Sequence, residues 1–297
     1  MQAVSAGLLA GFVGFASSFA VVLQGLVAVG ASPAQAASGL MALSVAMGLA
    51  GIVLSLKLRL PISVAWSTPG AALLAATVAP AGGFAEAVGA FIVCGALLTL
   101  AGLWKPLGRA VAAIPGPLAN AMLAGILFTL CLAPVRAVAE QPVAGLGIVL
   151  AWAVVARINR VLAVPAAVLV AVAVIATSAP QPMTGWIPQP EFVLPSFSIA
   201  ALTGIALPLF IVTMASQNIP GLAVLSANGY RPQAGPLFTT TGLFSLAGAP
   251  FGGHAVILGG ITAALCAGDG AGPGPAGRGV AAVVAGSLAT TMKLWPA

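Results

Sequence analysis

Charged residues are scarce in this sequence. Its 297 residues include ten Lys and Arg, four Asp and Glu, and one His. Charged residues make up 5% of the chain and hydrophobic residues 61%, whereas a soluble domain carries roughly a quarter charged residues. No soluble core of this size buries so much apolar surface, so lipid must serve as the solvent. The composition excludes a soluble globular protein and predicts an all-α polytopic membrane protein.

Clusters of reactive side chains are missing as well. The three cysteines, Cys94, Cys131 and Cys266, lie inside apolar runs without a Cys-x-x-Cys or Cys/His pattern, so we interpret them as packed thiols. The sequence has no nucleotide-binding loop, metal-ligand cluster or nucleophile–base set. We therefore expect no enzyme, no ATP-driven pump, no cofactor and no metal. The net charge of +6 comes from basic residues scattered through short loops, which is typical of a topology signal and not of a nucleic-acid site.

Cutting the chain at charges, prolines and polar clusters predicts about eleven membrane spans. These cover residues 3–29, 34–56, 67–79, 85–104, 118–132, 143–156, 162–178, 199–217, 235–246, 253–267 and 278–292. Eight of the ten basic residues follow even-numbered spans and so fall on one face of the membrane. By the positive-inside rule, the amino terminus is predicted to be cytoplasmic.

The second half of the chain repeats features of the first. Residues 15–18 read Phe-Ala-Ser-Ser and residues 214–217 read Met-Ala-Ser-Gln. Each motif is followed by an apolar run and then by a Gly-x-x-Pro turn, at Gly30 and at Gly229. By the span count the two motifs have opposite orientations. This pattern is typical of the inverted repeats of secondary transporters.

Residues 62–76, Ile-Ser-Val-Ala-Trp-Ser-Thr-Pro-Gly-Ala-Ala-Leu-Leu-Ala-Ala, predict a short strand followed by only half a membrane span. Ser67 or Thr68 is the expected N-cap, and Pro69 suits the first helical position. Residues 247–254, Ala-Gly-Ala-Pro-Phe-Gly-Gly-His, predict a second interrupted entry to a short helix at the corresponding place of the second repeat. Paired interrupted spans indicate a transporter binding site, so we expect the two helix starts to meet near the midplane.

The two helix starts supply most of the candidate substrate-binding residues. These are Ser67, Thr68 and Gly70 on one side, and Phe251, Gly252, Gly253 and His254 on the other. A helix start exposes unpaired N–H groups and the positive end of the dipole, so two of them are expected to hold a small carboxylate without Arg or Lys. The alternative is that Pro and Gly only kink packed helices.

Polar residues on two other spans complete the candidate set. Gln217 and Asn218 are adjacent amides in the apolar eighth span. They either bind a ligand or hold helices together, and Pro220 with Gly221 favours unwound backbone at a cavity. Ser17 occupies the corresponding place on the first span and is also a substrate-binding candidate, although close helix packing explains serine there too.

His254 is the only histidine and our proton-coupling candidate. A helix start disfavours imidazolium, so we expect a neutral ring at rest. A bound carboxylate would favour protonation of the ring and, by linkage, the proton would favour the carboxylate. The alternative is a neutral histidine that donates one hydrogen bond.

Three motifs together resemble the BenE family of benzoate/proton symporters: Trp66-Ser-Thr-Pro-Gly70, Met214-Ala-Ser-Gln-Asn-Ile-Pro-Gly221 and Pro250-Phe-Gly-Gly-His-Ala255. The resemblance runs to about residue 267 and fades after Arg278. It implies the uracil-permease and sulfate-carrier fold, in which two inverted seven-span repeats form a substrate-carrying core and a gate. Spans 3 and 10 of that fold are half-helices preceded by short strands. The resemblance implies import of benzoate or a related aromatic carboxylate with a proton, by movement of the core against the gate.

The resemblance also implies a division of the chain. Residues 1–104 and 199–297 correspond to the core, residues 105–179 to the first half of the gate, and residues 180–198 to an external linker. The second half of the gate would follow Ala297, so the chain is expected to be C-terminally truncated. The alternatives are a carrier of another small anion or a nucleobase, or a non-transporting remnant. The expected partners are the carboxylate, the proton and the lipid bilayer, without nucleic acid; homodimerisation is left open.

Overall fold

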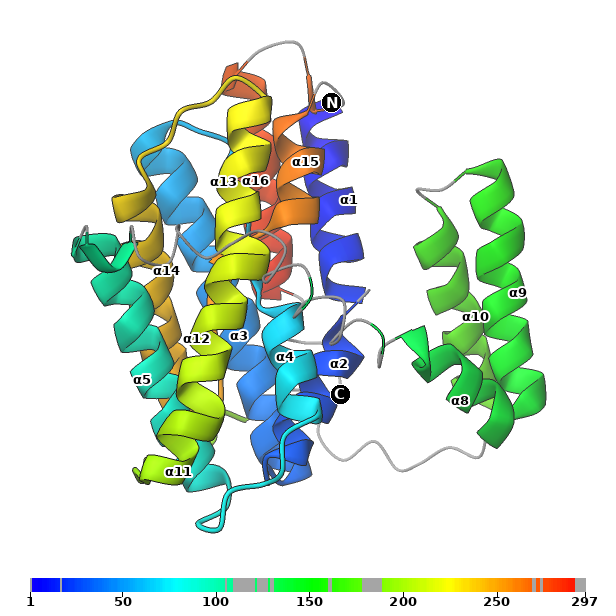
Figure 1. Ribbon diagram of the computed structural model, residues 1–297. Coiled ribbons are helices and arrows are strands. Elements are labelled where there is room, and N and C mark those ends of the chain that lie inside the picture. Colours follow the sequence, from blue (N-terminus) through cyan, green and yellow to red (C-terminus); the bar gives the residue numbers. More distant parts are fainter. Residues whose placement is uncertain are drawn as a thin grey trace.

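The computed structural model consists mostly of helices around one short two-stranded sheet (Figure 1). It describes residues 2–16, 18–104, 106–108, 121, 128, 131–159, 162–177, 189–268, 271–272 and 275–291. The first half contains α1 (Gln2–Ala16), α2 (Phe19–Ala28), α3 (Pro33–Leu58), β1 (Val64–Trp66), α4 (Thr68–Ala75), α5 (Phe84–Leu103), α8 (Ala133–Glu140), α9 (Pro142–Ile158) and α10 (Ala163–Thr177). The second half contains α11 (Ile199–Ala201), η1 (Leu202–Ala206), α12 (Leu207–Thr213), η2 (Met214–Asn218), α13 (Ile219–Ala227), α14 (Ala234–Gly248), η3 (Ala249–Phe251), β2 (Val256–Leu258), α15 (Gly260–Ala267) and α16 (Pro275–Thr291).

Four described helical stretches are long and apolar enough to cross a membrane. They are Gln2–Ala28, Pro33–Leu58, Phe84–Leu103 and Ile199–Ala227. Two shorter apolar helices cover Pro142–Ile158 and Ala163–Val174. These lengths and the composition are consistent with a polytopic membrane protein. The count of eleven spans and the pair of seven-span repeats stay predictions.

Local sequence explains where several helices begin. Ser32 and Gln35 form a capping box at the start of α3, each side chain bonding to the other's backbone N–H. Ser67 caps α4 by accepting a hydrogen bond from Gly70 N. Ser198 caps α11 in the same way.

The two strands form an antiparallel ribbon in which Val64 pairs with Leu258 and Trp66 with Val256. One backbone bond extends the ribbon at each end. Ser67 N donates to the Ala255 carbonyl, and Gly259 N donates to the Ser63 carbonyl, both at 3.0 Å. A short helix leaves each strand, α4 after β1 and α15 after β2. The prediction of half-helices preceded by short strands is therefore confirmed in both halves of the chain.

The position of the second half-helix differs from the prediction. The sequence placed its start at Phe251 to His254, but α15 begins at Gly260. Residues 255–258 pair with β1 and are therefore extended. Gly252 has a φ of 90°, the left-handed conformation that glycine adopts most easily, and it ends η3 before the ribbon. The two helix starts also do not meet: they lie at opposite ends of the ribbon, about 13 Å apart for four residue steps.

The eighth predicted span is a continuous helical stretch from Ile199 to Ala227, which we call span 8. The expected unwinding at Pro220 and Gly221 is wrong. Span 8 instead contains two wide π-helical turns, η1 and η2, each followed by a proline, Pro208 or Pro220. A proline lacks an N–H and its ring crowds the carbonyl one turn earlier, and a wider turn accommodates both effects. The sequence thus widens span 8 without breaking it.

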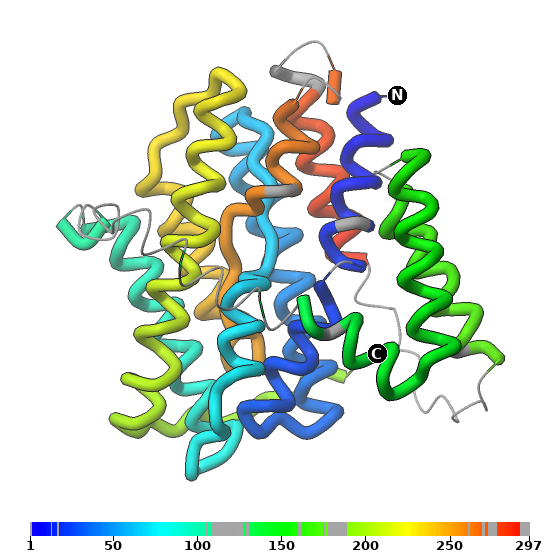
Figure 2. Tube along the Cα trace, turned by 45° about the vertical axis from the view of Figure 1, so that its right-hand side comes forward, coloured from blue at the N-terminus to red at the C-terminus, as the bar shows by residue number. Residues whose placement is uncertain are grey.

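The core packs around the ribbon through close helix pairs. α14 lies against α5, α16 lies against α1 and α3, and α2 lies against α4 (Figures 1 and 2). Glycine permits the closest of these contacts, since a Cβ on Gly48 of α3 would lie 2.5 Å from the Gly286 carbonyl oxygen of α16. Helix α16 is therefore an integral part of this core.

Helices α8, α9 and α10 stand to one side of the other helices, with α10 next to α1 (Figures 1 and 2). They fall within residues 105–179, the predicted gate. The described part of the predicted linker, residues 189–198, contains no helix or strand. It is hydrogen-bonded to both halves of the chain, because Val193 N donates to the Pro250 carbonyl and Ser196 N to the Ala85 carbonyl.

Candidate functional site

The start of α4 is closed by its own neighbours. Ser67 Oγ accepts from Gly70 N at 3.1 Å and lies 3.1 Å from Thr213 Oγ1 of span 8. Ser67 and Thr213 are fully buried, and Pro69 has no N–H to offer. Thr68 is half-buried beside them. Few hydrogen-bond donors therefore remain for a ligand at this end of the ribbon.

The start of α15 is open by contrast. Its N-cap is Gly259, and no side chain of the described residues caps the helix. The first N–H groups of a helix have no partner within it, and those of Gly260 and the next two residues have no backbone partner elsewhere among the described residues, so they are donors at the positive end of the dipole. Thr262 is only 9% exposed, and its hydroxyl accepts from Ser63 Oγ at 2.7 Å. This end of the ribbon therefore combines several donors, as an anion requires.

The adjacent amides of span 8 have different surroundings. Asn218 is fully buried and engaged at both ends. Its Oδ1 accepts from Leu258 N at 2.9 Å, and its Nδ2 lies 3.2 Å from Met214 Sδ. Gln217 is half-buried, and its Oε1 lies 3.5 Å from the place that a Cβ on Gly260 would take. Asn218 therefore ties β2 to span 8, while Gln217 lies beside the open start of α15.

The first span is tied to β1 in a comparable way. Trp66 is 2% exposed, and its Nε1 donates to Ser18 Oγ at 2.8 Å. Its ring packs edge-on against Phe15, with centroids 5.3 Å apart. The other serine of this motif, Ser17, was a binding candidate and lies outside the described residues. Each strand of the ribbon is thus bonded to a span of its own repeat through a polar side chain.

His254 lies at the α4 end of the ribbon and is fully buried. Its Nε2 is 3.0 Å from the Ser67 carbonyl oxygen. Because a carbonyl oxygen only accepts hydrogen bonds, this contact assigns a proton to Nε2 and leaves Nδ1 as an acceptor in the neutral ring. Nδ1 is buried without a partner among the described residues. The ring also packs edge-on against Phe91 at 6.3 Å.

The other residues of the predicted second helix start belong to a different environment. Ser38 Oγ donates to the Phe251 carbonyl at 3.0 Å, and the Phe251 ring packs on Phe192 of the linker at 5.9 Å. Gly252 packs against α3, and Gly253 N bonds back to the end of α14. These three residues therefore pack around α3, α14 and the linker, before the ribbon begins. The predicted substrate-binding residues are therefore divided among three places: the two ends of the ribbon, and the contacts of residues 251–253 with α3, α14 and the linker.

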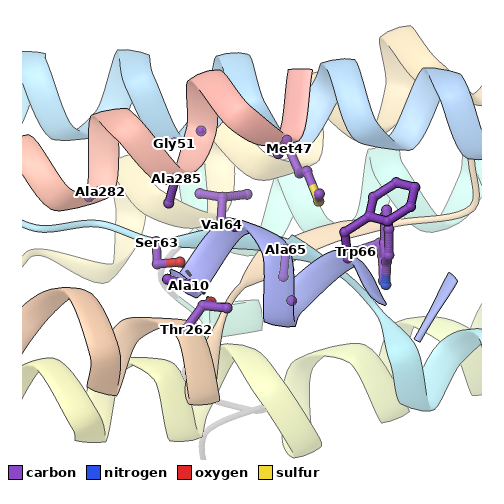
Figure 3. Close-up of a pocket in the computed structure, with 15 residues that line it drawn as sticks. Ala10, Met47, Gly51, Ser63, Val64, Ala65, Trp66, Thr262, Ala282 and Ala285 are labelled. Atoms are coloured by element: carbon purple, nitrogen blue, oxygen red, sulfur yellow. Dashed lines mark hydrogen bonds between the residues drawn. The ribbon is translucent and has the colours of Figure 1, made fainter. Parts of the chain in front are cut away.

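A small cavity of about 30 Å³ lies behind β1 (Figure 3). Its walls come from α1, α3 and α16, and Ser63 and Thr262 are hydrogen-bonded at its edge. This volume is about that of one water molecule, whereas a cavity that binds benzene measures about 150 Å³. The cavity therefore accommodates water but no aromatic ring.

A larger open hollow of about 940 Å³ lies between the end of α5, the start of α14 and span 8. Its span 8 wall is apolar, formed by Met214, Ile219 and Leu222. Among the described residues, no three His, Cys, Asp or Glu side chains come together as metal ligands.

Sequence reasoning missed Gly259, Gly260 and Thr262 at the start of α15. The available signal was the apolar run of residues 255–258, which matches the predicted strand of residues 62–66 and is followed by two glycines. Aligning residues 255–258 with the predicted strand of residues 62–66, instead of aligning Pro250 with Pro69, would have placed the second helix start correctly.

Comparisons with known proteins agree with this architecture of apolar helices. Residues 1–295 match the family model BenE, described as benzoate membrane transport protein. The chain is 39% identical over 284 residues to "Inner membrane protein YdcO" of Escherichia coli K12, covering 95% of this chain and 72% of that protein. It is 30% identical over 271 residues to "Benzoate membrane transport protein" of Acinetobacter baylyi, covering 90% of this chain and 68% of that protein. The family match continues through α16, so the expected fading of similarity after Arg278 is wrong.

Proposed function

The chain belongs to the BenE family of membrane transporters, and on this premise we propose that it imports benzoate or a related aromatic carboxylate together with a proton. The observation that carries the proposal is the uncapped start of α15, with the Thr262 hydroxyl and the Gln217 amide beside it. Every group there is neutral, and most are donors. A carboxylate supplies the matching acceptors.

The energetics of such a site are adequate without a basic side chain. A partly buried helix start stabilises an anion by up to about 2 kcal/mol. Each hydrogen bond to a charged group contributes about 1.5–3 kcal/mol. Two or three such bonds, together with the helix start, would offset the desolvation of one carboxylate. The aromatic ring would lie on the Gln217 side, because the cavity behind β1 is too small for it.

We assign the transported proton to His254. Its Nδ1 is a buried acceptor without a partner among the described residues, so it is the position at which a proton would add. The ribbon connects the ring with the start of α15, because His254 contacts the end of β1 and Gly259 pairs with its beginning. A proton on His254 at one end of the ribbon and a carboxylate at the start of α15 at the other end would thus stabilise each other through the ribbon.

The proposed movement uses the division predicted from the sequence. Residues 1–104 and 199–297 would form the core, residues 105–179 part of the gate, and residues 180–198 the linker on the outer face. The separate position of α8 to α10 supports this division, and the hydrogen bonds of residues 189–198 support a single rigid core. The proposed orientation, with the amino terminus in the cytoplasm of a cell whose inner membrane holds the protein, is tested by labelling cysteines placed in the loops.

Uptake of radiolabelled benzoate into proteoliposomes tests the function. We expect uptake in the presence of an inward proton gradient, and competition by substituted benzoates. Unlabelled uracil and small aliphatic acids serve as competitors for the alternative substrates. No gradient-driven uptake of benzoate, or stronger inhibition of this uptake by uracil or an aliphatic acid than by unlabelled benzoate, would contradict the proposal.

The proton assignment has its own experiment. His254→Gln keeps a donor for the Ser67 carbonyl and removes the titrating ring. We expect the wild-type rate of uptake to rise as the external pH falls, and the variant rate to lose this dependence. A variant that transports with an unchanged pH profile would rule out His254 as the proton carrier.

A further inference from the structure

The larger hollow lies where span 8 separates from α5 and α14. The end of α5 and the start of α14 pack closely, since a Cβ on Gly235 would lie 2.9 Å from the Gly102 carbonyl oxygen. Span 8 packs against α5 through η1 and α12, whereas α13 packs against α15 instead (Figure 1). The hollow of about 940 Å³ between them is apolar, and Gln233 is the only polar side chain among the described residues that line it.

A free positive charge lies next to this hollow. Arg231 is two residues before Gln233, so its backbone is within about 7 Å of the lining. Both side chains are exposed, and no hydrogen bond or ion pair joins either of them to another described residue. An exposed guanidinium group and an exposed amide are therefore available to a ligand at this edge.

The acidic residues of the surrounding elements lie far from this edge. Glu86 is in the first turn of α5, a helix of 20 residues and about 30 Å, whose other end borders the hollow. Glu191 N donates to Ser38 Oγ, which donates to the Phe251 carbonyl beyond the end of α14. Glu140, the third acidic residue that the structure describes, ends α8 in the separate group of helices. The positive charge at the hollow thus complements an anion.

We propose that this hollow binds one anionic phospholipid, with the phosphate group at Arg231 and Gln233 and an acyl chain along the apolar wall of span 8. Basic pockets between membrane helices bind anionic head groups in this way. Leu103, which lines the hollow, and Trp104 are exposed at the end of α5. Tryptophan is enriched at the membrane surface, so the opening lies at the depth of lipid head groups. The site is separate from α15 and does not depend on the proposed substrate.

Size and lining distinguish this ligand from an aromatic carboxylate. A cavity that binds benzene measures about 150 Å³, so a single ring would fill only a small part of the hollow. An acyl chain is long and flexible enough to cover Met214, Ile219 and Leu222 together. Met214 Sδ lies 3.2 Å from Nδ2 of Asn218, whose Oδ1 accepts from β2. A bound chain would thus pack against the residue that supports the tie between span 8 and the ribbon.

Native mass spectrometry of the full chain in detergent measures the binding. The probes are dioleoylphosphatidylglycerol, which is anionic, and dioleoylphosphatidylcholine, which has the same acyl chains and no net charge. Arg231→Gln removes the charge, and Arg157→Gln, at an exposed arginine of α9, is its matched control. Leu222→Trp fills the hollow, and Leu150→Trp, at an exposed position of α9, controls for the added ring.

We expect the wild type to bind one phosphatidylglycerol about fivefold more tightly than phosphatidylcholine, the change that one basic residue gives near anionic lipid. Arg231→Gln should lose this preference, and Arg157→Gln should keep it. Leu222→Trp should lose the tightly bound lipid, and Leu150→Trp should retain it. Phosphatidylglycerol should raise the melting temperature of the wild type but not that of Leu222→Trp, because only a ligand of the folded state stabilises it.

Equal affinity of the wild type for the two lipids, or equal effects of Arg231→Gln and Arg157→Gln, would overturn the proposal. So would unchanged lipid binding in Leu222→Trp. Displacement of the lipid by benzoate would make the hollow a substrate site, and displacement by glycerol 3-phosphate would show that the acyl chain has no part in binding; both results count against the proposal. If Leu222→Trp does not fold, the two arginine variants decide the outcome.

Discussion

The adjacent amides of span 8 provide the sharpest test of the assignment of the site. Asn218→Leu removes the acceptor of the Leu258 N–H while keeping a side chain of similar size. Asn218 is fully buried, so the strand N–H would lose its partner without gaining water. An orphaned buried donor costs about 1–3 kcal/mol. At about 2–4 °C per kcal/mol, the melting temperature should fall by several degrees.

Gln217→Leu is the matched control on the neighbouring residue. The Gln217 amide is half-buried, and no hydrogen bond joins it to another described residue. The free energy of unfolding should therefore change by less than about 0.5 kcal/mol. Loss of one hydrogen bond to a carboxylate should instead weaken benzoate binding by about tenfold or more.

The assay is thermal unfolding of both variants in detergent, paired with benzoate binding to the folded protein. The expected result is a crossed pattern, in which Asn218→Leu changes mainly stability and Gln217→Leu mainly affinity. If Gln217→Leu melts several degrees lower and Asn218→Leu melts like the wild type, the division of roles between the two amides is refuted.

Three further substitutions test the ribbon and its surroundings. Trp66→Phe removes the indole donor to Ser18 of the first span, so the free energy of unfolding should fall by about 0.5–1.5 kcal/mol, as measured by thermal unfolding. Trp152→Phe, at a half-exposed ring, is the control and should leave the melting temperature unchanged. Gly260→Ala should fold normally, because the new Cβ would meet only an ordinary contact at 3.5 Å. Its methyl group would obstruct the start of α15, so the dissociation constant for benzoate should rise about tenfold or more. Gly48→Ala should lower stability by about 1–3 kcal/mol without a specific effect on affinity, because its methyl group would overlap the backbone of α16; an unchanged melting temperature would contradict the close contact of α3 and α16.

Sequence alone determined those features that depend on local energies. The scarcity of charge established lipid as the solvent, and hydropathy located the long apolar helices. The order Ser67-Thr-Pro-Gly narrowed the N-cap of α4 to Ser67 or Thr68, because capping involves only residues a turn apart, and the structure shows Ser67 in that role. The strand before it followed from the alternation of residues 62–66, and the structure confirms both.

Tertiary structure decided which residues lie at the proposed ligand site. The register of β1 with β2 drew residues 255–258 into the ribbon and moved the second helix start to Gly260, a choice made by hydrogen bonds between residues about 190 positions apart. The same pairing left His254 at the α4 end. Whether an amide bonds to a strand or lies beside a helix start also depends on long-range packing, so Asn218 and Gln217 were indistinguishable in the sequence. The sequence thus indicated a strand and a short helix in the first half of the chain. Only the pairing of β1 with β2 in three dimensions showed that the uncapped helix start is that of α15.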